Sequence, residues 1–170
     1  MCGATSPSEA VVHAPSLLDK LLGHAGDGGL ATGTLPRWPL ERVKQALARD
    51  LESLLNTRSA WTTERLQGRP RVARSVLALG MADVGTECAD SDHSRRRIAE
   101  RIRQTLVAHE RRLAEVVVGV RRGADRRLVF TIDARLRLQA AVEPVRFDAE
   151  LLAGAQRYAV VPAARGRFGC

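Results

Sequence analysis

The sequence has little of what disulfide-linked, metal-binding or base-stacking proteins need. Its three cysteines, Cys2, Cys88 and Cys170, are odd in number, two lie at the ends of the chain, and none belongs to a CxxC spacing. We therefore expect reduced thiols with no structural role. Aromatic residues make up only 4% of the chain, so a core must be built mainly from Leu, Val, Ile and Ala. Few rings are present to stack on bases or sugars.

Long hydrophobic runs are also absent. Residues 1–15 contain no apolar run long enough for a signal peptide, and no later stretch approaches the roughly 18 apolar residues of a membrane span. We expect a cytoplasmic protein without membrane insertion.

The usual motifs of catalysis and cofactor binding are missing. The four histidines, His13, His24, His93 and His109, show no HxxxH or HxxE spacing, which disfavours a zinc site. No serine lies in a GxSxG turn, and no glycine loop has the GxxxxGK or GxGxxG form. The sequence therefore predicts no cofactor and no metal.

Paired carboxylates leave one enzymatic alternative open. A glycosidase needs two carboxyl groups across the scissile bond. Glu110, Glu115, Asp133 and Glu143 are the only carboxylates near predicted ordered elements that could converge, and nothing in their spacing requires them to do so. A muralytic, lysozyme-like enzyme stays an alternative hypothesis.

The chain is basic, and most of its positive charge comes from arginine. Twenty-seven Lys and Arg against nineteen Asp and Glu give a net charge of +8. Arginine favours bidentate contacts with carboxylates and phosphates. The basic clusters are Arg95–Arg97 with Arg101 and Arg103, and Arg121–Arg122 with Arg126–Arg127. Acidic residues interrupt them and no nucleic-acid-reading module follows, so an Arg-mediated nucleic-acid binder is a disfavoured second alternative.

Composition predicts three regions along the chain. Residues 1–34 form a flexible arm rich in Gly, Ser, Ala and Thr, residues 35–161 form one domain, and residues 162–170 form a basic tail. Within the arm, residues 16–22 predict a short amphipathic helix. Its apolar side chains, which we expect to bind a partner, are Leu17, Leu18, Leu21 and Leu22.

Two helices are predicted from apolar residues that recur every three or four positions. The first spans Pro39–Asn56, and its apolar stripe is Leu40, Val43, Leu47, Leu51, Leu54 and Leu55. The second runs from near Asp92 to about His109, with Ile98, Ile102 and Leu106 on one face. Between the two helices the chain is irregular. The apolar patch Val76–Leu79 predicts a short buried element, and periodicity cannot tell whether it is a helix or a strand.

The period then changes to two, which predicts strands. Leu113–Val120 is a strand candidate, Arg121–Arg126 a hairpin loop, and Leu128–Leu138 alternates apolar and polar residues. Val145–Asp148 and Arg157–Val161 are further short candidates. The fold class is α+β, with N-terminal helices followed by a small antiparallel sheet.

The junction between the second helix and the first strand carries Glu110-Arg111-Arg112-Leu113. A carboxylate and a guanidinium held together at an element boundary can form a fixed bidentate anchor. A solvated surface pair is the simpler alternative.

Several blocks in this order resemble a known family. They are Ser16–Leu22, Asp50–Arg58, Ser75–Leu77 leading to Gly80–Asp83, Glu110–Leu113 and the alternating strand. In this order they resemble the TssE baseplate subunits of type VI secretion systems and the related wedge proteins of contractile phage tails. The correspondence spans about residues 16–161.

The resemblance implies a structural protein and not an enzyme, although such families were long labelled lysozyme-like. In the family a Glu-Pro-Arg motif anchors the subunit to the wedge core formed by TssF and TssG. Glu110 and Arg112 match its first and third positions, while Arg111 replaces the proline. The sheet of the family is similar to the handshake domain of sheath subunits, which exchange strands.

The resemblance also implies partners and a location. We expect partner contacts through Glu110, Arg111 and Arg112 and through the arm, with TssF, TssG and TssK and with the sheath subunits TssB and TssC. The assembled protein would lie at the cytoplasmic side of the inner membrane.

Overall fold

The structure, a computed structural model of the 170-residue chain, describes residues 19, 38–61, 63–81, 91–123, 127–138, 141–152 and 156–163. Leu17, Leu18, Leu21 and Leu22 of the predicted arm lie outside the described residues, as does the tail beyond Ala163. The chain divides into two compact units, residues 1–46 and 47–170, each of which is described by itself.

In the first unit the described segment is the start of helix α2 (Leu40–Asn56), close to the predicted boundary. Pro39 precedes the helix, and its carbonyl accepts hydrogen bonds from the backbone N–H groups of Arg42 and Val43 at 3.0 and 3.3 Å. The Arg42 guanidinium lies 4.5 Å from the centre of the Trp38 ring. This cation–π contact and the proline carbonyl fix the first turn.

The two long helices contribute their predicted apolar faces to the core of the second unit. In the second half of α2, Leu47, Leu51 and Leu55 are buried. Helix α5 (Asp92–His109) begins at Ser91, whose Oγ accepts a hydrogen bond from the Ser94 N–H at 3.0 Å. Its buried face is the predicted one and consists of Ile98, Ala99, Ile102, Thr105 and Leu106. Both helix predictions are confirmed.

Three short elements lie between these helices: α3 (Thr63–Leu66), α4 (Pro70–Ala73) and the 3₁₀ turn η1 (Val76–Ala78). The prediction that Val76–Leu79 is buried was wrong. Val76 is 78% exposed and Leu77 59%, and Ala78 alone of the four is buried. A single 3₁₀ turn directs successive side chains to different sides, so one turn cannot bury all of them.

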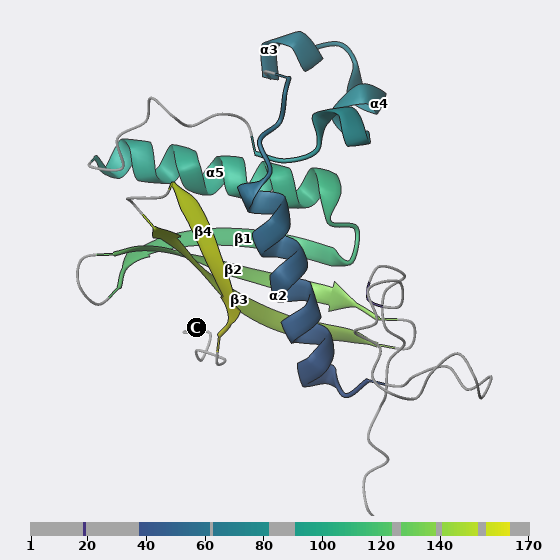
Figure 1. The fold of residues 1–170 in the computed structure, drawn as a ribbon, viewed down its shortest axis with the longest axis vertical. Helices are drawn as coiled ribbons and strands as arrows, with labels where there is room; N and C mark the ends of the chain where they lie inside the picture. The colour runs from purple at the N-terminus through teal and green to yellow at the C-terminus, as the bar shows by residue number, and fades with distance from the viewer. Residues whose placement is uncertain are drawn as a thin grey trace, which may run out of the picture. The chain divides into compact units, whose positions relative to one another are not determined.

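The strands are β1 (Leu113–Arg122), β2 (Leu128–Arg137), β3 (Val142–Leu152) and β4 (Arg157–Pro162). They form one antiparallel sheet in the order β1-β2-β3-β4, and Figure 1 shows the helices preceding it along the chain. The α+β prediction is confirmed. Strand β3 is longer than the predicted Val145–Asp148, because its whole length pairs with β2 from Val142 to Leu151.

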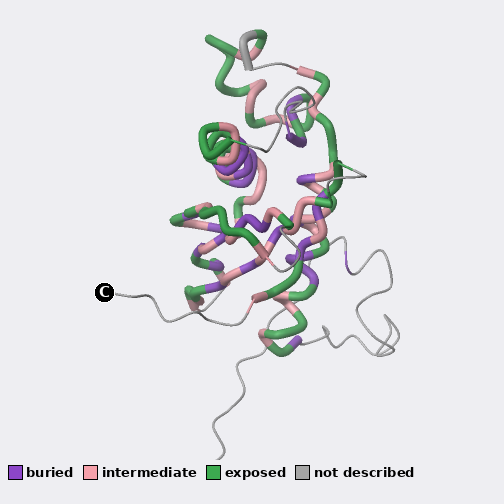
Figure 2. The backbone as a smooth tube through the Cα atoms, turned by 90° about the vertical axis from the view of Figure 1, so that its left-hand side faces the viewer, coloured by how far each residue is buried: buried purple, intermediate pink, exposed green. Residues whose placement is uncertain are grey.

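The sheet has one apolar and one charged face. On β2, alternate residues Phe130, Ile132, Ala134 and Leu136 are buried, as the alternation predicts. Helix α5 packs against β1. Figure 2 shows the buried stretches of helix and strand facing the interior of this unit. The second unit therefore has a helix-on-sheet core.

Candidate partner-binding site

The predicted anchor lies in a three-residue link between α5 and β1. The backbone N–H of Glu110 donates to the Leu106 carbonyl at 2.8 Å and so ends the helix. The Leu113 N–H donates to the Glu110 carbonyl at 3.2 Å and starts the strand. This tight turn brings Glu110 and Arg112 to the same side of the backbone.

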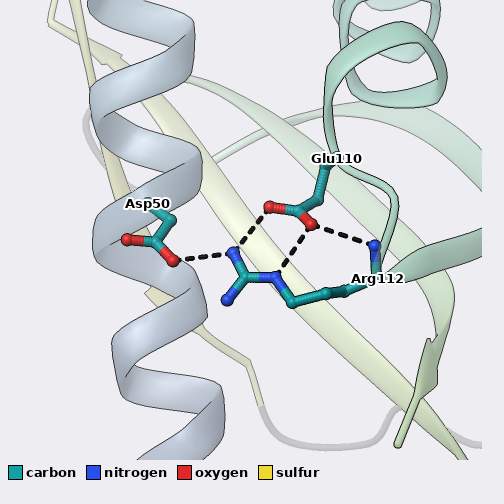
Figure 3. Close-up of polar contacts among 3 residues, drawn as sticks. All are labelled: Asp50, Glu110 and Arg112. Carbon is teal, nitrogen blue, oxygen red and sulfur yellow. Dashed lines mark hydrogen bonds and ion pairs between the residues drawn. The ribbon is translucent and has the colours of Figure 1, made fainter. Parts of the chain in front are cut away.

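Glu110 and Arg112 form a bidentate pair (Figure 3). Arg112 Nε donates to Glu110 Oε1 at 2.8 Å, and Arg112 Nη2 donates to Glu110 Oε2 at 2.6 Å. The Arg112 backbone N–H adds a third hydrogen bond to Oε1 at 3.0 Å. Three hydrogen bonds within one short link fix both side chains before any partner binds.

Asp50 of α2 joins the pair and was not singled out as a site residue from the sequence. Arg112 Nη2 donates to Asp50 Oδ2 at 2.6 Å, across 62 residues of sequence. We call Asp50, Glu110 and Arg112 the clamp. The one sequence signal for Asp50 is its place beside Leu51 at the edge of the apolar stripe, where polar side chains meet neighbouring elements.

The clamp is partly exposed and consists of charged side chains. Its side chains are 24%, 11% and 35% exposed for Asp50, Glu110 and Arg112. Hydrogen bonding to Glu110 raises the pKa of the Arg112 guanidinium above its ordinary value, with a smaller contribution from Asp50, while burial opposes the rise. Two carboxylates around one guanidinium leave a formal charge of −1 at neutral pH.

One donor group of the clamp is not used within it. Arg112 Nη1 has no hydrogen bond to any residue that the structure describes, and in Figure 3 it points away from both carboxylates. Arg111, the third predicted residue, is exposed next to the clamp, and its side chain makes no hydrogen bond or ion pair with the three clamp residues. A partner would meet an ordered set of donors and acceptors, so little side-chain entropy would be lost on binding.

Three of the four carboxylates of the enzymatic alternative pair with different arginines. Glu115 Oε2 lies 3.0 Å from Arg135 Nε, and Asp133 Oδ1 lies 2.6 Å from Arg146 Nε, whereas Glu110 belongs to the clamp. Within the described ranges no three His, Cys, Asp or Glu side chains are grouped so as to hold a metal ion. None of the helices in the described part of the chain combines the length and apolarity needed to cross a membrane.

Four arginines of the nucleic-acid alternative form close ion pairs with carboxylates. The pairs are Arg95–Asp92, Arg103–Glu100, Arg121–Asp148 and Arg127–Glu150, with nitrogen to oxygen distances of 2.6–2.7 Å. Pairing reduces the positive potential that a phosphate backbone would meet.

The outer edge of β4 is covered by side chains from α2. Asn56 Oδ1 accepts from the Tyr158 N–H at 2.8 Å, and Asn56 Nδ2 donates to the Tyr158 carbonyl at 2.9 Å. Glu52 Oε2 accepts from the Val160 N–H at 2.9 Å. The next residue facing outward is Pro162, which has no N–H. This edge is closed to a further strand.

The outer edge of β1 differs. Gly123 N–H donates to the Arg127 carbonyl, so by alternation along the ladder Gly119 and Arg121 face β2. The backbone groups that face outward belong to Val118, Val120 and Arg122. In the described part of the chain no hydrogen bond to these groups is recorded. No described residue therefore pairs with this edge, and an edge of this kind can accept a further strand.

Comparison with known proteins identifies a family. A family model described as baseplate wedge protein gp25 matches residues 41–141, more than half of the chain. The matched range includes the three clamp residues, α5, β1 and β2. Searches of curated proteins and of solved structures found no significant match.

Proposed function

The chain belongs to the baseplate wedge protein gp25 family, and on that premise we propose that it links the wedge complex of a type VI secretion system to the first ring of the contractile sheath. A structural role in a baseplate follows from the family itself. The finer assignment, including a non-enzymatic role in the cytoplasm at the inner face of the membrane, is our proposal.

The clamp carries the proposal. Glu110 and Arg112 match the ends of the Glu-Pro-Arg motif, and their mutual hydrogen bonds support a preformed anchor for TssF and TssG. Where the motif has a proline, Arg111 adds an exposed positive charge beside the clamp. Asp50 acts as a positioning residue, because it ties Arg112 to α2.

The test is co-purification with TssF and TssG. We expect Glu110→Gln and Arg112→Gln to weaken binding at least about tenfold, since each breaks a charge-assisted bidentate pair at the contact. The matched control is Arg146→Gln, which breaks a similar bidentate pair with Asp133 within the sheet. The control should retain binding within about twofold.

Circular dichroism and thermal unfolding of every variant distinguish lost binding from lost folding. The anchor assignment would be wrong if the folded clamp variants bound as tightly as the wild type. The whole proposal would be wrong if the wild type failed to bind TssF and TssG.

The open edge of β1 supports the second half of the proposal. A strand from a sheath subunit, TssB or TssC, would gain main-chain hydrogen bonds from Val118, Val120 and Arg122. The closed edge of β4 gives such a strand nowhere to pair. We therefore assign sheath joining to β1. TssK remains a proposed neighbour without an assigned surface.

A further inference from the structure

Residues 58–81, between α2 and α5, form a long loop whose two ends are paired with each other. We call this loop the excursion and its paired ends the base. The chain leaves at Arg58 and returns at Met81, and these two residues form a parallel bridge. Met81 N–H donates to the Thr57 carbonyl at 2.8 Å, and Ser59 N–H donates to the Met81 carbonyl at 2.9 Å. The buried side chain of Met81 anchors the return. The excursion is therefore held at both ends.

Gly80 makes the closed base possible. Its φ is +107°, a conformation that side chains rarely adopt, and an added Cβ would lie 2.4 Å from the Thr57 carbonyl oxygen. The two chain segments approach so closely that the position accepts only glycine. This close approach directs the preceding turn outward.

The outward turn exposes apolar and basic side chains together. Val76, Leu77 and Leu79 are exposed at the end of the excursion, and the arginines that precede them are exposed as well. We call residues 69–79 the tip, and its basic residues are Arg69, Arg71 and Arg74. Among the described residues none of these three has an ion-pair partner, unlike Arg95 and Arg103 of α5 and Arg121 of the sheet.

The tip is rigid enough to be a binding surface. Ser75 Oγ accepts from the Leu77 N–H at 3.3 Å and donates to the Val72 carbonyl at 2.8 Å, which joins α4 to η1. Single exposed apolar residues need no explanation, but three within four positions beside three unpaired cations form a patch that a partner would cover. In Figure 1, α3 and α4 stand away from the sheet.

We propose that the tip docks an acidic amphipathic helix of a partner protein. Apolar side chains of such a helix would cover Val76, Leu77 and Leu79, and its flanking carboxylates would pair with the arginines. Charge complementarity selects this occupant, because all the charged side chains of residues 65–81 are arginines. The tip shares no residue with the clamp or with the β1 edge.

Two other anionic surfaces fit less well. A membrane interface usually takes aromatic side chains or a long amphipathic helix, whereas residues 63–81 contain no aromatic residue and α4 has only four residues. Nucleic acid would leave the apolar side chains uncovered and has no ring to stack on. Both surfaces become outcomes of the experiment.

The experiment measures binding of the full chain to a labelled synthetic helix by fluorescence anisotropy. The probe is a peptide of about 18 residues with Leu at helical spacing and Glu on the flanks. A scrambled peptide of the same composition is its control. Parallel arms use vesicles of phosphatidylcholine with about 30% phosphatidylglycerol, and a single-stranded DNA of about 20 nucleotides.

We expect the helical peptide to bind and the scrambled peptide to bind at least about tenfold more weakly. Arg71→Glu with Arg74→Glu, and separately Val76→Ser with Leu77→Ser, should each weaken binding at least about tenfold. The matched controls, Arg96→Glu with Arg137→Glu and Val107→Ser with Val142→Ser, change exposed residues elsewhere. The controls should stay within about twofold.

Three outcomes would overturn the proposal. They are equal binding of the scrambled peptide, equal losses in the control pairs, or tip-dependent binding to the vesicles or DNA without binding to the peptide. The tip variants should keep their binding to TssF and TssG, so a failure here is distinguishable from a failure of the clamp assignment.

Discussion

The two outer edges of the sheet differ in whether side chains hydrogen-bond to their outward backbone groups. At β4, Asn56 and Glu52 satisfy the outward backbone groups of Tyr158 and the N–H of Val160. At β1, no described side chain does the same for Val118, Val120 or Arg122. Exposed edges invite uncontrolled pairing, so proteins normally protect them. The protected β4 edge stabilises the fold, and the contrast supports our proposal that a further strand pairs at β1.

Breaking the protection of β4 should have the largest effect. Asn56→Ala removes two hydrogen bonds and leaves both backbone groups of Tyr158 without a partner. We expect a loss of about 2–3 kcal/mol in the free energy of unfolding, measured by urea titration. Ser53→Ala, an exposed neighbour on α2, is the control and should change stability by less than about 0.5 kcal/mol. Equal effects of the two changes would contradict the role assigned to Asn56.

Raising the pH should also destabilise the β4 side. Burial raises the pKa of Tyr158 from 10.0 to about 12. Above pH 10 the unfolded chain releases this proton while the folded chain keeps it, so stability is fully present below pH 10 and falls as the pH rises toward 12. We expect a loss of about 2 kcal/mol across that window.

Tyr158→Phe should abolish this slope. Urea unfolding at several pH values measures it, and tyrosinate absorbance reports this residue alone, because Tyr158 is the one tyrosine in the chain. The same slope in the variant would show that another group titrates.

A smaller effect is expected at Glu52. Glu52→Ala removes the acceptor of the Val160 N–H and should cost about 1 kcal/mol. Glu52→Gln keeps a carbonyl oxygen in place and should lose less than about half of that. Thermal unfolding of both variants tests whether the hydrogen bond or the charge protects the edge. A Gln variant as unstable as the Ala variant would favour the charge.

At β1 the smallest effect on stability is expected. Val120→Pro removes an outward N–H that pairs with nothing described, so unfolding should change by less than about 1 kcal/mol. Sheath initiation from purified TssB and TssC on the wedge should nevertheless fail, as seen by electron microscopy. Gly119→Pro, one residue earlier, removes an inward N–H and should destabilise the fold by about 3 kcal/mol.

Normal sheath initiation by a folded Val120→Pro variant would exclude β1 as the joining edge. Val120→Thr, which keeps the N–H, is the matched control and should initiate sheath assembly like the wild type.

Local patterns predicted much of the fold, and long-range contacts explain what they missed. Helices α2 and α5 and the alternation of β2 follow from spacing within each segment, so the sequence was sufficient for them. The four residues Val76–Leu79 are too few to show a period, and the close contact between Gly80 and Thr57 next to them joins positions far apart in the sequence.

The candidate site was only half predictable for the same reason. Glu110 and Arg112 are two residues apart, and their pairing could be inferred from the sequence. Asp50 and Asn56 contact residues 62 and 102 positions away, and no local spacing encodes those contacts. Both lie in the block Asp50–Arg58 that supports the family resemblance, which located the segment without giving its contacts.

The bulge in β1 limits how strongly the β1 edge can bind one incoming strand. The register of β1 on β2 shifts between Ala114 and Val117, and Glu115 has a φ of +51°. The regular part of the β1 edge therefore runs only from Val117 to Arg122, a length that suits a short incoming strand. A single strand pairing of this length would be weak and reversible. A ring of subunits would therefore be held together by the avidity of many such pairings. A wrongly placed strand could dissociate before the ring closes.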